Sequence, residues 1–84
     1  MLIRFWLKFD PLPPSPVNLG CGVTAYDYND ALTLLREKVF VGKQMPGIVE
    51  VVEDIDIRTL DTNHVIPNME APTIRGIWFP KGFR

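Results

Sequence analysis

Cys21 and His64 are the only cysteine and the only histidine in this 84-residue chain, and together they suggest nucleophilic catalysis. A thiol becomes a strong nucleophile when an imidazole takes its proton, and a third polar group usually orients the imidazole. Asp61 lies three residues before His64 and can serve as that third group. Glycines on both sides of Cys21 would let a substrate approach the sulfur closely. One hypothesis is therefore an enzymatic or small-ligand site built from Cys21, His64 and Asp61.

The same residues have a plainer interpretation, which the sequence favours. Cysteine often behaves as a small buried hydrophobic residue, and glycines commonly mark turns and bulges. Nothing in the sequence places position 21 beside position 64. A histidine in a turn-rich segment more often hydrogen-bonds the backbone than acts as a base. We therefore favour a protein that is not an enzyme and expect no cofactor.

An acidic stretch offers carboxylates that could bind a divalent metal ion. Asp54-x-Asp56 resembles the start of a calcium-binding loop, but no glycine supplies the sharp turn, and the surrounding residues predict a strand. A solvated strand face that deters edge pairing is the better interpretation. We therefore expect no metal site. The acidic stretch comprises Glu50, Glu53, Asp54, Asp56 and Asp61.

The first strand, residues 2–9, has two chemically different faces because side chains alternate along an extended chain. One face is apolar, whereas the other carries Trp6 between Arg4 and Lys8. The last strand, residues 73–79, has large apolar groups on both sides, so we expect an aromatic side chain to remain on the outer face. Aromatic and Arg residues dominate binding energy at protein interfaces. The predicted contact residues are Arg4, Trp6, Lys8, Arg75, Trp78 and Phe79.

Two purely structural explanations of the same residues are alternatives to a contact surface. Burial of at least one of Trp6 and Trp78 in the core is favoured over exposure of both. The acids of residues 50–61 can also pair with the cations of residues 75–84 if their strands are neighbours.

One helix is strongly predicted, from Tyr28 to about Val41. Asp27 is a good N-cap, Asp30 lies near the positive end of the helix dipole, and Gly42 supplies a left-handed stop. A short β-prone run at residues 23–26 precedes the helix. A long strand at residues 48–58 follows it. Its inward, apolar register is Val49, Val51, Ile55 and Ile57, and because Glu53 falls on the same side, we expect a bulge near residues 52–53 or a buried partner for Glu53. The proline-rich segment 10–16 and residues 60–72 are predicted loops.

The predicted order is therefore β-(β)-α-β-β in a single domain, residues 1–84. One helix can cover one face of a small sheet, which indicates a two-layer α+β domain with three or four mainly antiparallel strands. No second helix is predicted, so we expect the other sheet face to need a partner or a second copy of the chain.

Composition restricts the setting and the partners. A net charge of −1 and a pI near 5.7 argue against nucleic-acid binding, which needs a basic surface. The apolar start is only nine residues long and is interrupted by charges, so it predicts neither a signal peptide nor a membrane span. A single cysteine is typical of a reducing, cytoplasmic protein.

Two stretches, GCGVTAYDYNDALTLLREKVF and HVIPNMEAPTIRGIWFP, resemble a family of short uncharacterised bacterial proteins. The resemblance covers nearly the whole chain and implies no catalytic or binding residues. The strand-to-helix passage through Tyr26, Asp27 and Asp30 is similar to small antitoxin-like domains of the HicB type, which implies an α+β fold.

The sequence therefore favours a protein-binding module, with an immunity or antitoxin-like inhibitor as one concrete form. Two alternatives remain open. One is a homodimer whose second sheet face is buried by its symmetry mate, and the other is the Cys21 and His64 site.

Overall fold

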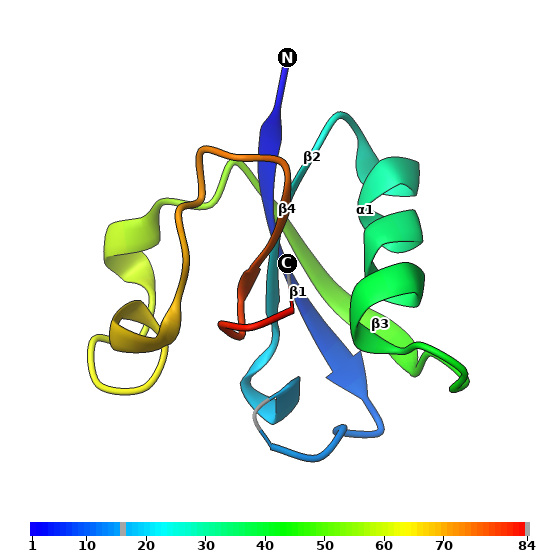
Figure 1. The fold of residues 1–84 in the computed structure, drawn as a ribbon. Coiled ribbons are helices and arrows are strands. Elements are labelled where there is room, and N and C mark those ends of the chain that lie inside the picture. Colours follow the sequence, from blue (N-terminus) through cyan, green and yellow to red (C-terminus); the bar gives the residue numbers. More distant parts are fainter. Residues whose placement is uncertain (16, 84) are drawn as a thin grey trace.

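The computed structural model describes residues 1–15 and 17–83, and shows a four-stranded antiparallel sheet with one helix on one face (Figure 1). The strand order is β3-β1-β2-β4, and every pairing is antiparallel. The predicted α+β class and the order β-β-α-β-β are confirmed. The strands are β1 (Ile3–Asp10), β2 (Cys21–Ala25), β3 (Gly47–Glu53) and β4 (Gly76–Phe79), and the helix is α1 (Tyr28–Leu34), which continues as a π turn (Leu35–Val39).

Helix α1 begins where the sequence predicts and ends slightly earlier. The Asp27 side chain accepts a hydrogen bond from the Asp30 amide at 2.8 Å, as an N-cap should. The last turn is widened, because the Phe40 amide donates to the Leu35 carbonyl at 2.9 Å, five residues back. Gly42 then adopts φ +67°, which confirms the predicted left-handed stop.

The helix-side core fills the space between α1 and the sheet. Phe5, Leu7 and Phe9 of β1 are buried there, and Leu34 and Leu35 of the helical segment pack against them. The strand alternation predicted for β1 is therefore confirmed on this face. Burial of each such side chain stabilises the fold by about 1.5–3 kcal/mol.

The second face of the sheet is covered too, by residues 54–75 rather than by a helix or a partner. This segment crosses from β3 to β4 on the side of the sheet opposite α1 (Figure 1). Ile55 and Val65 of the segment are buried in one cluster with Trp6, Trp78 and Phe79. The prediction that an aromatic side chain remains outside is wrong, because this irregular segment supplies the missing layer.

Two strands are shorter than predicted. β3 ends at Glu53 instead of residue 58, because Asp54 takes a left-handed conformation with φ +52° and turns the chain away. The register shift lies opposite the step from Lys8 to Phe9 and not at residues 52–53, so the predicted bulge position is wrong. β4 begins at Gly76 instead of residue 73.

Candidate functional site

Cys21 and His64 lie on opposite sides of the sheet, so the structure does not bring the predicted nucleophile and base together. Cys21 is fully buried in the helix-side core. His64 is exposed in the segment that covers the other face. Burial raises the pKa of the Cys21 thiol to about 12, which keeps the sulfur protonated and unreactive near neutral pH.

Asp61 does contact His64 as predicted, but in a local turn. Its carboxylate accepts hydrogen bonds from the backbone amides of Asn63 at 2.7 Å and His64 at 3.1 Å. The same carboxylate lies 3.2 Å from Nδ1 of the His64 ring. These contacts lower the pKa of Asp61, with the Asn63 amide as the largest cause. The arrangement is typical of an Asx turn that shapes the covering segment. Within residues 1–15 and 17–83, no three His, Cys, Asp or Glu side chains gather as metal ligands would.

The aromatic members of the predicted contact surface are inaccessible. Trp6 is 5% exposed, Trp78 0% and Phe79 1%. Trp6 packs against Trp78 and Phe79, with ring centroids 6.0 and 5.5 Å apart. These three side chains form the second core and cannot touch a partner in this structure. Their role as direct contacts is therefore replaced by a role in stability.

The basic members of that surface are dispersed. Lys8 is exposed and lies 3.7 Å from Glu50 of the neighbouring strand β3. Arg4 is half-buried near Asp54 at the start of β1. Arg75 binds Asp30 of α1, far from both. The expected pairing between residues 50–61 and 75–84 is absent from the described ion pairs, because β3 and β4 are the two opposite edges of the sheet.

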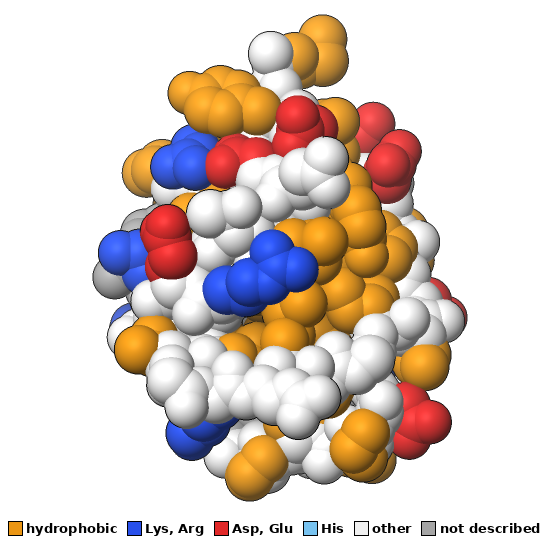
Figure 2. Space-filling view, turned by 90° about the vertical axis from the view of Figure 1, so that its right-hand side faces the viewer, with side chains coloured by type: hydrophobic (Ala, Val, Ile, Leu, Met, Phe, Trp, Pro, Cys, Tyr) orange, Lys and Arg blue, Asp and Glu red, His pale blue; other side chains and the backbone are white. Residues whose placement is uncertain are grey.

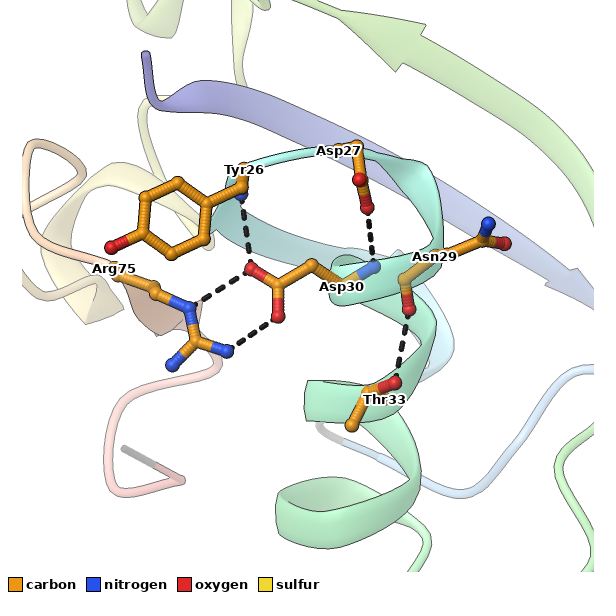
Figure 3. A network of polar contacts seen from close by, with 6 residues as sticks. All are labelled: Tyr26, Asp27, Asn29, Asp30, Thr33 and Arg75. Atoms are coloured by element: carbon orange, nitrogen blue, oxygen red, sulfur yellow. Dashed lines mark hydrogen bonds and ion pairs between the residues drawn. The ribbon is translucent and has the colours of Figure 1, made fainter.

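Figure 3 shows how Arg75 is held at the start of α1. Its Nε donates to Asp30 Oδ2 at 2.9 Å, and its terminal nitrogen donates to Asp30 Oδ1. The guanidinium also lies over the Tyr26 ring, 5.5 Å from the centroid. The Arg75 hydrogen bonds are the main reason that the pKa of Asp30 lies below its ordinary value. This network joins α1 to the chain entering β4, and we call it the Asp30 clamp.

The two edges of the sheet differ in how they are covered. The outer edge of β4 is closed by the segment before it, since the Glu70 amide donates to the Trp78 carbonyl at 2.7 Å and the Lys81 amide donates to the Asn68 carbonyl at 3.0 Å. In the described part of the chain, no backbone hydrogen bond is made to the outer edge of β3. The amides and carbonyls of β3 that point away from β1 therefore have no backbone partner within residues 1–15 and 17–83.

Exposed apolar side chains accompany this open edge. Val49 is 64% exposed and Val51 is 38% exposed. Helix α1 packs mainly on β2 and β4, and the helical segment covers β3 less fully, with Ile48 as the β3 side chain that packs against the helix-side core. Figure 2 shows hydrophobic side chains gathered beside the helix on this face of the molecule.

The helix contributes to the same surface. With about 100° between successive residues, Tyr28 and Leu32 lie on the flank opposite Asp30, which faces β4 through Arg75. Tyr28 also contacts Phe5, whose partner in β3 is Glu53. We call the outer edge of β3 and the adjoining apolar side chains the β3 surface; its side chains are Tyr28, Leu32, Ile48, Val49 and Val51.

Charge is arranged unevenly around the β3 surface. Glu53 and Asp54, at one end of β3, have no ion-pair partner in the described part of the chain. Arg36 is exposed and lies one helical turn before Phe40, which packs on Phe9, the partner of Ile48 near the start of β3. The remaining acids of the stretch are paired with neighbours: Glu50 with Lys8 at 3.7 Å, Asp56 with Arg58 at 2.8 Å and Asp61 with His64 at 3.2 Å.

Sequence reasoning missed the β3 surface because it assigned Val49 and Val51 to the inward register. One signal was available, since apolar and polar residues alternate less regularly along residues 47–53 than along β1.

In the described residues, no helix is long and apolar enough to cross a membrane. Comparisons of the chain with protein-family models, with curated proteins and with solved structures gave no match, so the resemblances described for the sequence stay predictions.

Proposed function

We propose that the protein is a protein-binding module that accepts an extended segment of a partner protein along β3. The observation that carries this proposal is the contrast between the two sheet edges. The edge of β4 is closed by backbone hydrogen bonds, whereas the edge of β3 is open and flanked by exposed valines. Strand addition satisfies the unpaired amides and carbonyls of such an edge, and alternate side chains of the added segment supply specificity.

The charges at the two ends of β3 define the chemistry of the partner segment. A basic side chain is favoured beside Glu53 and Asp54, and an acidic one toward Arg36. Apolar side chains between them would cover Val49 and Val51. Every pairing in the sheet is antiparallel, so we expect the added segment to run antiparallel to β3.

An immunity or antitoxin-like inhibitor is the concrete form that we propose, acting in the cytoplasm. Support comes from the small size and from a thiol that is free and buried, which agrees with a reducing compartment. An inhibitor needs a stable surface and no catalytic group, and the separation of Cys21 from His64 is consistent with that requirement.

The alternative occupant is β3 of a second copy. Antiparallel pairing about a two-fold axis would bring Glu53 of one copy toward the Arg36 end of the other, so the charges are also compatible with self-association. Concentration separates the two cases, because self-association weakens on dilution whereas an isolated partner site stays open.

A peptide titration tests the proposal. The probe is the peptide Lys-Thr-Val-Thr-Val-Thr-Glu, which places its Lys opposite Glu53 when it runs antiparallel to β3, and the matched control has Lys and Glu exchanged. We expect the first peptide to shift the NMR signals of β3 and to bind roughly fivefold more tightly. Equal affinities, or shifts confined to other elements, would contradict the proposal.

Two variants locate the binding. Val51→Lys adds a charge on the helix side of the open edge, a substitution that protects natural sheet edges, and should abolish peptide binding. Val41→Lys makes the same chemical change at an exposed position beyond the helix end and should leave binding unchanged. Similar losses in both variants would mean that the peptide does not use β3.

A further inference from the structure

A second binding feature lies at the opposite end of the helix from the Asp30 clamp. Here the proline-rich loop, the π turn and the turn before β3 surround a cavity of about 360 Å³. This volume is at the lower end of the range for small-molecule sites, about 300–1,000 Å³. The lining residues include Pro11, Leu12, Pro13, Phe40, Lys43 and Phe83.

The walls of the cavity are built from stiff parts. Proline rings fix the backbone of the loop, and the Val17 amide donates to the Pro14 carbonyl at 3.1 Å, which holds the far end of the loop in place. The opposite wall carries Phe40, whose ring packs edge-on against Phe9 at 5.4 Å. Walls of restricted backbone and packed rings lower the cost of ordering the site when a ligand binds.

The helix is also irregular where it meets the cavity. Val39 and Phe40 line the cavity, and both belong to the π turn or its end. The wider turn shifts these two side chains relative to a regular α-helix. Single π turns occur frequently at functional sites, so the irregularity is a second and independent indication of binding.

The lining has one kind of charge. Lys43 is the only charged residue among the described lining residues, and no described acid pairs with it. Its backbone is fixed, because the Lys43 amide donates to the Phe40 carbonyl at 3.1 Å. Gln44 and Ser15 add neutral polar groups. Most of the remaining wall is apolar.

We propose that this cavity binds a small apolar carboxylate. The apolar part of the ligand would lie against the prolines, Phe40 and Phe83, and its carboxylate would receive hydrogen bonds from the Lys43 ammonium and the Gln44 amide. Few polar groups in an apolar pocket fix the orientation of a ligand in this way. The proposal gives the proline-rich loop a role as a wall of the site, and it does not depend on the function proposed for β3.

The test compares octanoate with octanamide, which has the same shape and no charge. Each compound is titrated into the ¹⁵N-labelled protein, and binding is read from the backbone amide signals of Val17, Val39, Lys43 and Gln44. We expect saturable shifts with octanoate and roughly fivefold weaker binding of octanamide. Absence of saturable shifts, shifts at other surfaces, or equal affinities would overturn the proposal.

Lys43→Met identifies the group that binds the carboxylate. Methionine keeps much of the lysine stem and removes the charge, and Lys43 is exposed, so the fold should persist. The variant should bind octanoate and octanamide equally. Lys38→Met removes a charge from the same helix end but outside the cavity, and should keep the fivefold preference. A preference that persists in Lys43→Met would contradict the assignment of Lys43.

Discussion

Asp30, in the first turn of α1, receives two hydrogen bonds from the guanidinium of Arg75, which lies 45 residues later in the chain. The same carboxylate accepts a hydrogen bond from the Tyr26 amide at 3.0 Å (Figure 3). A single side chain therefore joins the end of β2, the start of the helix and the chain that enters β4. This contact ties the helix to the β4 side of the sheet, whereas no described ion pair joins the helix to β3.

The Asp30 clamp predicts a dependence of stability on pH. The pKa of Asp30 is lowered in the folded state, so its stabilisation is present above the unfolded pKa of about 4 and is lost as pH falls through the folded pKa. Asp30→Asn should reduce the free energy of unfolding at pH 7 by about 0.5–1 kcal/mol, a value discounted because the guanidinium is partly exposed. Urea unfolding at pH 7 and pH 3 should show this difference shrinking at the lower pH.

Asp27→Asn is the matched control for the clamp. Asparagine caps a helix about as well as aspartate, so this variant should be nearly neutral at both pH values. If Asp27→Asn destabilises as much as Asp30→Asn, the effect belongs to general charge at the helix start and not to Arg75.

Cys21 should resist alkylation in the folded protein. Its pKa is raised to about 12 by burial, so the thiolate population near neutral pH is very small. Reaction with iodoacetamide at pH 8 should be more than about 100-fold slower than that of free cysteine, and should accelerate in urea. Rapid alkylation without denaturant would show an accessible thiol and would support the hypothesis that Cys21 is a nucleophile.

Trp6 should behave as a core residue. Trp6→Ser removes a buried indole that packs against Trp78 and Phe79, so it should destabilise the fold by about 3–5 kcal/mol. Lys8→Ser changes an exposed residue on the same strand face and should alter stability by less than about 0.5 kcal/mol. Circular dichroism during urea unfolding measures both. Wild-type stability in Trp6→Ser would place the indole outside the core.

Gly22 should tolerate no side chain, because a Cβ there would lie 2.4 Å from the Trp78 ring. Trp78 is fully buried and has little room to move, so Gly22→Ala should destabilise by about 2–3 kcal/mol. Gly42→Ala meets no atom within 4 Å but must adopt φ +67°, and should destabilise by about 1 kcal/mol. Thermal unfolding gives the ranking, and an equal or reversed order would contradict the packing of Trp78 on Gly22.

Local signals allowed the helix start and the β1 alternation to be predicted. Asp27 and Asp30 act within one turn of each other, and the inward register of Phe5, Leu7 and Phe9 follows from a period of two. Such features need no knowledge of distant residues. The stop at Gly42 is of the same kind.

The second core and the open edge could not be predicted in the same way. Trp6 is covered by Ile55 and Val65, which lie in a segment with no regular period. The separation of Cys21 from His64 depends on which side of the sheet that segment crosses. Likewise, the exposure of Val49 and Val51 follows from the strand order β3-β1-β2-β4, a long-range property that pairs of adjacent residues do not encode.

Hydrogen exchange of the β3 amides tests the central claim most directly. The amides of Gly47–Glu53 that point away from β1 should exchange rapidly in the free protein, and a saturating amount of Lys-Thr-Val-Thr-Val-Thr-Glu should slow them at least about tenfold. Protection should be the same at two protein concentrations tenfold apart. Strong protection without peptide that disappears on dilution would mean that a second copy fills the edge, and unchanged exchange with bound peptide would contradict strand addition at β3.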